Sequence, residues 1–391
     1  MNWNDKTAAN VKAIKPSGIR KFFDIAAQVK GVLSLSIGEP DFAAPDKVLA
    51  AMKASLDAKE TSYTGNSGMM ELRKAISHHF EQRYGVHYDP KDEILVTVGV
   101  SEGLAMALLA ITEPGDEVII PDPAYVAYPA SVELAGGTPI FVPTYPEHDF
   151  KLTVEALEKV ITPKTKAIVI GYPNNPTGTV MSAEELMPIA KFAEEHDLIV
   201  LSDEIYCELM YGDAKFTSFA KLPGMRERTV IFNGFSKAYA MTGMRLGYVC
   251  APREGLAPIL KLHQYAIMCA NTTAQVGGIT ALKECDDDVE AMRQEYDRRR
   301  KVIYKGLCDM GLPVFEPKGA FYIFPDIRCT GMTSAEFCEK LVQEEKVAVV
   351  PGTAFGDQGE GFVRISYAAS MDTIQEALKR MARFVAKYRK D

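Results

Sequence analysis

The sequence predicts an α/β protein with a mostly parallel seven-stranded sheet in a large domain, accompanied by a smaller α+β domain. Seven short apolar runs recur between residues 93 and 250, helical patterns separate many of them, and the pattern changes after about residue 285. At 391 residues the chain also exceeds the size at which one hydrophobic core usually keeps growing. We therefore expect a large domain at 46–284 and a small domain formed by 1–45 with 285–391.

The apolar runs have the length and composition of buried strands. They span residues 93–98, 117–121, 139–143, 167–171, 198–202, 229–232 and 246–250. Helical stretches at 101–111 and 182–196 lie between them, and the second opens with a Ser-x-x-Glu capping box at Ser182 and Glu185. Crossover helices of this kind favour parallel pairing of the strands that they join.

The C-terminal part has a different pattern, with longer helices and fewer strands. A charged amphipathic helix is expected at 288–310, strands at 320–324, 347–350 and 363–367, and a closing helix at 372–388. The N-terminal segment up to about residue 45 contains several Gly and Pro residues and is expected to pack beside this part.

Charge and composition limit the functions that fit. The formal net charge is -8, and Lys and Arg are scattered along the chain, which argues against a nucleic-acid or anionic-membrane partner. No apolar run is long enough to span a bilayer, and the N-terminus lacks the apolar core of a signal peptide. Seven cysteines without a C-x-x-C motif suit a reducing compartment, so we expect a cytoplasmic protein. No metal-ligand spacing is present, and no metal site is expected.

Unusual polar groups follow five of the predicted strands. Open α/β sheets bind ligands beyond the carboxyl ends of their strands, where these groups would meet. The segments are 99–103 (Gly-Val-Ser-Glu-Gly), 122–125 (Asp-Pro-Ala-Tyr), 172–178 (Tyr-Pro-Asn-Asn-Pro-Thr-Gly), 203–206 (Asp-Glu-Ile-Tyr) and Lys237. Each alone fits a helix start, a turn or an N-cap. Together they favour a site for one aromatic, phosphorylated cofactor.

Lys237 carries the most specific part of this pattern. It lies between small residues just after a strand, eight positions before Arg245. A lysine amine in a cleft can form a Schiff base, and a nearby guanidinium suits a phosphate. A solvated loop lysine is the structural alternative, and the neighbouring strand-end groups weigh against it.

These residues resemble a known family. Lys237 and its surroundings, with 175–178 (Asn-Pro-Thr-Gly) and 203–206, are similar to the fold-type I pyridoxal-phosphate aminotransferases of class I, most like bacterial and archaeal aspartate or aromatic aminotransferases. Segments 37–42, 63–64, 318–322 and 362–366 follow in family order, so the resemblance covers nearly the whole chain. It implies transfer of an amino group between an aspartate-type or aromatic L-amino acid and a 2-oxo acid such as 2-oxoglutarate.

The resemblance also implies roles for the residues that meet the cofactor ring. Lys237 would bind the aldehyde of pyridoxal 5′-phosphate and then move the substrate Cα proton. Asp203 would keep the ring nitrogen protonated. Tyr206 and Asn175 would donate hydrogen bonds to the ring oxygen, and Tyr125 would stack on the ring while also lining the substrate site with Asn175.

Further residues would bind the phosphate and the substrate. The resemblance places the phosphate against the backbone N–H groups of Val100 and Ser101 at a helix N-terminus. Ser236 and Arg245 would add a hydrogen bond and charge, and Tyr63 would reach the phosphate from a neighbouring subunit, which implies a homodimer with shared active sites. Arg364, aided by the Gly38 N–H group, would bind the substrate α-carboxylate.

Three other functions remain as alternatives. The same cofactor fold supports β-lyases of the cystathionine or cysteine-conjugate type, because the pocket selects which bond breaks. The 99–103 segment also matches G-x-S-x-G, so an α/β serine hydrolase using Ser101 with His148, His196 or His263 is a more distant alternative, although no oxyanion-loop motif is present. A non-catalytic regulator is disfavoured by the intact Lys237 and Asp203.

Overall fold

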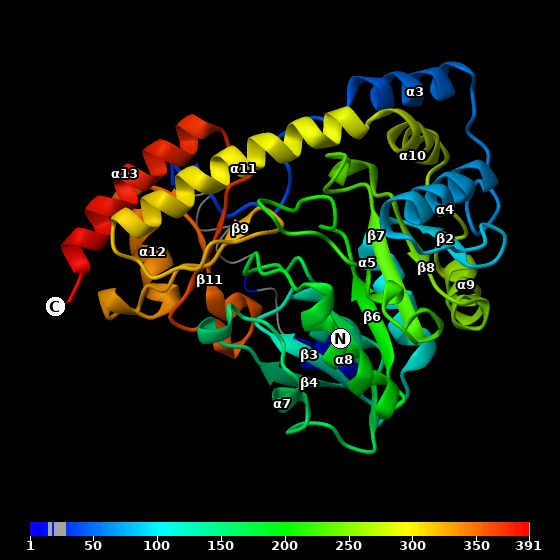
Figure 1. Ribbon diagram of the computed structural model, residues 1–391, viewed down its shortest axis with the longest axis horizontal. Helices are drawn as coiled ribbons and strands as arrows, with labels where there is room; N and C mark the ends of the chain where they lie inside the picture. The colour runs from blue at the N-terminus through cyan, green and yellow to red at the C-terminus, as the bar shows by residue number, and fades with distance from the viewer. Residues whose placement is uncertain (15–17, 19–28, 391) are drawn as a thin grey trace.

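A seven-stranded β-sheet forms the centre of the larger part of the computed structural model, which describes residues 1–14, 18 and 29–390 (Figure 1). The strand order across the sheet is β2-β8-β7-β6-β5-β3-β4. The strands are β2 (Ile94–Thr97), β3 (Glu117–Asp122), β4 (Thr138–Pro143), β5 (Thr165–Ile170), β6 (Ile199–Asp203), β7 (Thr229–Gly234) and β8 (Gly247–Cys250). β8 runs antiparallel to both of its neighbours, and the other pairings are parallel.

Helices cover both faces of this sheet, which explains why its strands are continuously apolar. Neighbouring residues point to opposite faces, as with Val118 and Ile119 on β3. One face packs on α5 (Gly99–Ile111), α6 (Ala127–Leu134) and α9 (Arg253–Ala266). The other packs on α3 (Asp46–Asp57), α4 (Met70–Tyr84), α7 (Val154–Leu157), α8 (Ala183–Glu195) and α10 (Thr272–Glu284).

The C-terminal region, residues 285–391, contains the long helix α11 (Asp286–Asp309), which extends from beside α10 to a cluster with α13 (Figure 1). The remaining elements are α12 (Ser334–Glu345), α13 (Met371–Tyr388), β9 (Tyr322–Ile323), β10 (Val347–Ala348), β11 (Val350–Pro351) and β12 (Val363–Ser366). β11, β12 and β9 form an antiparallel sheet, while β10 pairs with β1 (Leu33–Ser34). Their core contains buried aromatic side chains, among them Tyr296 and Phe321.

The fold class predicted from sequence is confirmed, and so is the capping box: Ser182 accepts from the Glu185 N–H group, and the Glu185 carboxylate accepts from the Ser182 N–H group. The strand expected at 347–350 is instead two short strands, because the chain leaves the pairing with β1 and joins β12. The helix expected from residue 101 already begins at Gly99. The proposed domain boundaries stay a prediction, and residues 15–17, 19–28 and 391 of those ranges lie outside the described residues.

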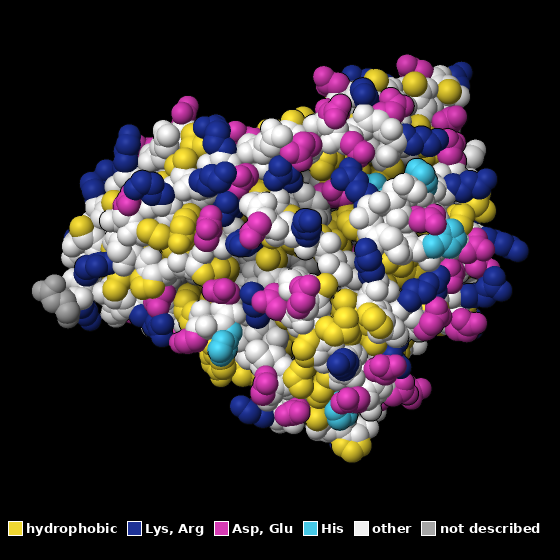
Figure 2. Space-filling view, viewed as in Figure 1, with side chains coloured by type: hydrophobic (Ala, Val, Ile, Leu, Met, Phe, Trp, Pro, Cys, Tyr) yellow, Lys and Arg dark blue, Asp and Glu magenta, His cyan; other side chains and the backbone are white. Residues whose placement is uncertain are grey.

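The surface carries charges of both signs. On the face shown in Figure 2, Lys and Arg side chains are interspersed with Asp and Glu over the whole view. Among the helices that the structure describes, none combines the length and hydrophobicity needed to cross a bilayer.

Candidate active site

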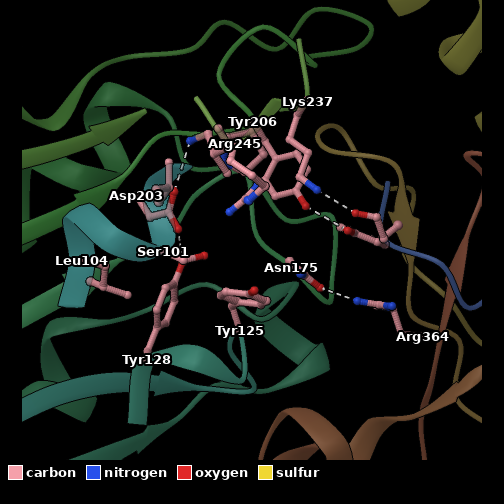
Figure 3. A pocket seen from close by; sticks show the side chains of 15 residues that line it. Ser101, Leu104, Tyr125, Tyr128, Asn175, Asp203, Tyr206, Lys237, Arg245 and Arg364 are labelled. Atoms are coloured by element: carbon pink, nitrogen blue, oxygen red, sulfur yellow. Dashed lines mark hydrogen bonds between the residues drawn. The ribbon is translucent and has the colours of Figure 1, made fainter. Parts of the chain in front are cut away.

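A cavity of about 300 Å³ lies at the carboxyl ends of the parallel strands, against the first turn of α5 (Figure 3). Its volume is in the range of small-molecule sites. Ten of the residues predicted from sequence line it: Gly38, Val100, Ser101, Tyr125, Asn175, Asp203, Tyr206, Lys237, Arg245 and Arg364. The structure therefore brings together residues from segments that are more than three hundred positions apart in sequence.

Lys237 follows β7 and points into the cavity. Its Nζ donates a hydrogen bond to the carbonyl oxygen of Gly38 at 2.7 Å. Burial, reinforced by the Arg364 guanidinium, lowers the pKa of Lys237 to about 8. About a tenth of this amine is thus neutral, and nucleophilic, at pH 7, compared with far less for an unperturbed lysine.

Asp203 is the last residue of β6, and its carboxylate faces the same cavity. The side chain is 8% exposed. Tyr128 donates to its Oδ2 at 2.8 Å and the Ile205 N–H group donates to its Oδ1 at 3.2 Å. Burial raises the pKa of Asp203, while these two bonds and Lys237 act in the opposite direction. A cation placed against Asp203 would compensate its buried charge.

Tyr128 was not predicted from sequence, and neither was Tyr322. Tyr128 lies three residues after Tyr125, and their rings are 5.6 Å apart. Tyr125 lies just before α6 and Tyr128 is in its first turn, and the repeat of Tyr three residues apart is the signal that could have identified Tyr128. The hydroxyl groups of Tyr322, on β9, and Tyr206, after β6, share a 2.8 Å hydrogen bond, which links the C-terminal region to the seven-stranded sheet.

Arg364 lies on β12 with 2% of its surface exposed. It donates to Asn175 Oδ1 at 3.0 Å and to the carbonyl oxygen of Ser36 at 2.6 Å, while its buried Nε has no partner. Its guanidinium carbon lies 4.6 Å from the ring centre of Tyr322 and 4.7 Å from that of Phe355. No carboxylate of the described residues pairs with this buried cation. Such a group is suited to an anionic ligand.

The first turn of α5 and Arg245 form a second place for an anion. The backbone N–H groups of the first turn of a helix have no partner within the helix, and Val100 and Ser101 lie there. Gly99 has a φ of +74°, and a Cβ at this position would lie 2.6 Å from an Arg245 nitrogen. A Cβ on Gly247 would lie 2.8 Å from the Val100 nitrogen. The two glycines therefore allow the guanidinium and this turn to come close together.

The charges that line the cavity fit the cofactor implied by the family resemblance. Lys237, Arg245 and Arg364 are cationic and Asp203 is the one carboxylate among the described lining residues. This excess of positive charge suits a phosphate and a substrate carboxylate together. The Asp203 carboxylate suits a protonated ring nitrogen.

Two predicted residues lie outside the lining of the cavity, and one of the three histidines of the hydrolase alternative is not paired with Ser101. Ser236 precedes Lys237 in a turn and is half-buried, and Tyr63 is 80% exposed. His263, a candidate for the hydrolase alternative, bonds through Nδ1 to Glu102 at 2.8 Å, and its Nε2 has no partner. Neither nitrogen of His263 bonds to Ser101, so these two residues form no nucleophile–base pair.

Comparisons with known proteins agree with this geometry. The family model for class I and II aminotransferases matches residues 30–381. The aspartate aminotransferase of Pyrococcus abyssi is 50% identical over 370 residues, covering 94% of this chain and 95% of that protein. The aromatic-amino-acid aminotransferase 2 of Thermococcus litoralis is 47% identical over 373 residues, covering 95% and 96%. The crystal structure of an aromatic aminotransferase from Pyrococcus horikoshii has a TM-score of 0.90 at 48% identity, covering 94% of this chain and 99% of that one.

Proposed function

Since this chain belongs to the class I and II aminotransferases, we propose that it binds pyridoxal 5′-phosphate through Lys237. With this cofactor it would transfer an amino group between an aspartate-type or aromatic L-amino acid and a 2-oxo acid such as 2-oxoglutarate. The observation that carries the proposal is that Lys237, Asp203 and Arg364 line the same cavity. When bound, pyridoxal phosphate supplies an electron sink for the bond that breaks at the substrate Cα.

The lysine side of the cavity would hold this cofactor and move protons. Lys237 would hold it covalently, and its amine would accept and return the substrate Cα proton. The Asp203 carboxylate stabilises a protonated ring nitrogen. Tyr206 donates a hydrogen bond to the ring oxygen, and the first turn of α5 with Arg245 and Ser236 binds the phosphate.

The other side would bind the substrate. The buried Arg364 guanidinium binds the α-carboxylate with the Gly38 N–H group, and Tyr125 lies against the ring and the substrate. The Asn175 side-chain oxygen accepts a bond from Arg364, which leaves the amide N–H₂ group free to donate. In this proposal residues 1–45 with 285–391 form a small domain that closes on the large domain at 46–284 and excludes water.

A cytoplasmic homodimer completes the proposal. Tyr63 is 80% exposed and Tyr265 is 86% exposed, and the segments around them are joined by the bond from Thr272 to the Ser62 carbonyl oxygen at 2.8 Å. Large exposed aromatic side chains on adjoining segments favour contact with another protein surface. Tyr63 would reach the phosphate of the neighbouring subunit. Sedimentation of the purified chain tests the dimer.

Trapping the cofactor on Lys237 tests the proposal directly. Incubation with pyridoxal phosphate, borohydride reduction and peptide mass spectrometry should place the adduct on the peptide that carries Lys237. Because the neutral amine reacts, the initial rate of attachment should rise with pH and level off above about pH 8. Peptides with exposed lysines, such as Lys53, give the background. An adduct confined to other lysines would contradict the assignment.

The reaction and the donor require a second experiment. A panel that includes L-aspartate, L-phenylalanine and 2-oxoglutarate should give a new amino acid from the oxo acid. The β-lyase alternative predicts instead that L-cysteine conjugates release pyruvate without any oxo acid. Release of pyruvate faster than amino transfer would assign the lyase reaction.

A further inference from the structure

A buried carboxyl group outside the cavity lies where the end of β3 meets the segment 352–359. Asp122 is 4% exposed. Its Oδ2 accepts a bond from the Gln358 N–H group at 3.3 Å, and its Oδ1 is buried without a partner. Gly356 has a φ of +137°, and any Cβ at this position would overlap Asp122 Oδ1. The Ala124 N–H group adds a 2.9 Å bond to the Phe355 carbonyl oxygen.

The same segment supports Arg364. The Phe355 side chain is 4% exposed, and its ring centre lies 4.7 Å from the Arg364 guanidinium carbon. The Gly352 N–H group bonds to the carbonyl oxygen of Phe362 at 2.9 Å, just before β12. A continuous set of contacts thus runs from Asp122, through the segment 352–359, to Arg364.

We propose that Asp122 is a positioning residue for Arg364: by fixing the segment 352–359 to the end of β3, it holds the Phe355 ring against the guanidinium that binds the substrate carboxylate. This inference rests on the proposed function, in which Arg364 has that role. Asp122 itself touches neither the cavity nor its ligand, so its loss should weaken substrate binding more than catalysis.

The charge on Asp122 makes the contact sensitive to pH. Burial raises its pKa to about 6; the backbone N–H groups of Gln358 and Asp357 act against this rise, and the Asp357 carboxylate adds to it. The other described groups packed against it, Thr144 after β4 and residues 352–356, are uncharged. The buried position therefore favours the protonated Asp122 carboxyl group. Ionisation of Asp122 favours instead an arrangement in which segment 352–359 has moved away and water reaches the carboxylate. As pH rises through about 6, the contact should weaken and the affinity of Arg364 for carboxylates should fall.

Asp122→Ala and Asp122→Asn test the proposal as a matched pair. Asp122→Ala removes the acceptor for Gln358, so KM for L-aspartate or L-phenylalanine should rise roughly tenfold with kcat within about twofold. Asp122→Asn keeps the shape and one acceptor oxygen without the charge. Between pH 5 and 7.5 the dissociation constant of an α-methyl amino acid, measured by calorimetry on the cofactor-loaded protein, should rise several-fold in the wild type and by clearly less in Asp122→Asn.

Gly356→Ala approaches the same contact from its other side. Its Cβ would displace the Asp122 carboxyl group, so the KM increase should resemble that of Asp122→Ala, and the double variant should show less than the product of the two.

An unchanged KM in Asp122→Ala, or the wild-type pH dependence in Asp122→Asn, would overturn the inference while leaving the transaminase intact. Absence of transamination by the wild type would overturn the proposed function itself, and this inference with it. If Asp122→Ala does not fold, the comparison between wild type and Asp122→Asn still decides.

Discussion

The two ends of the cavity are built differently. The lysine end is formed by Asp203, Lys237, Arg245 and the first turn of α5, which lie at the ends of sheet strands and in the turns that follow them. The arginine end is assembled from separate segments. Asp203 on β6 lies beside Phe232 on β7 in a parallel ladder, so the sheet fixes the lysine end. The arginine end, formed by Gly38, Tyr322, Phe355 and Arg364, depends on contacts between parts of the chain far apart in sequence.

This difference indicates that chemistry and substrate affinity are separable. Hydrogen bonds of the sheet hold the lysine end whether or not substrate is present, whereas the arginine end is held by Ser36, Asn175 and the segment 352–359. Changes at the lysine end should therefore lower kcat, and changes at the arginine end should raise KM. Four substitutions test this contrast.

Lys237→Ala should have the largest effect. It removes the amine that attaches the cofactor and moves the Cα proton, so kcat should fall on the order of 10⁴-fold or more. The borohydride-dependent adduct should disappear, while pyridoxal phosphate should still bind reversibly near Arg245. Steady-state kinetics and dialysis measure these effects, and a variant with more than a tenth of the wild-type kcat would contradict the role of Lys237.

Asp203→Asn should lower kcat by roughly 10² to 10³. The amide oxygen can still accept from the Ile205 N–H group, and the amide N–H₂ can donate to the Tyr128 hydroxyl, so the shape of the site is kept while the charge that stabilises a protonated ring nitrogen is lost. Cofactor attachment at Lys237 should persist, which distinguishes this variant from Lys237→Ala. A kcat within a few-fold of the wild type would mean that Asp203 does not face the ring nitrogen.

Arg364→Lys should move the effect from kcat to KM. An ammonium group cannot replace the two hydrogen bonds to Asn175 and Ser36, nor the forked geometry that matches a carboxylate. We expect kcat/KM to fall about 100-fold, mainly through KM, with the affinity for pyridoxal phosphate unchanged. If cofactor affinity and kcat fell together instead, the two ends of the cavity would not be independent.

The same contrast explains what could be predicted from sequence. The lysine end was predictable because apolar runs identify strands, and the carboxyl ends of parallel strands share one edge, so Asp203 and Lys237 could be placed together. Arg364 was predicted only through the family resemblance, since its strand carries no local signal of the cavity. The end of β3 at Asp122 was located from sequence, but the contact of Asp122 with Phe355 and its segment, and that of Tyr322 with Arg364, depend on which segments meet across the molecule, and no periodicity in the sequence encodes such contacts.

Tyr128→Phe should give the smallest effect and sharpen the comparison at the lysine end. It removes the hydroxyl group that donates to Asp203 Oδ2 at 2.8 Å and leaves the Ile205 N–H bond in place. Because the lost bond lowers the pKa of Asp203, that pKa should rise in the variant, and the carboxylate should become protonated at higher pH than in the wild type. The acid limb of the kcat profile should therefore move upward by up to about one pH unit, with a loss in kcat of roughly five-fold at neutral pH and little change in KM.

Tyr125→Phe is the matched control, since its ring also lines the cavity and its hydroxyl makes no such bond to Asp203. An acid limb that moved equally in both variants would show that aromatic packing, rather than this hydrogen bond, sets the ionisation of Asp203.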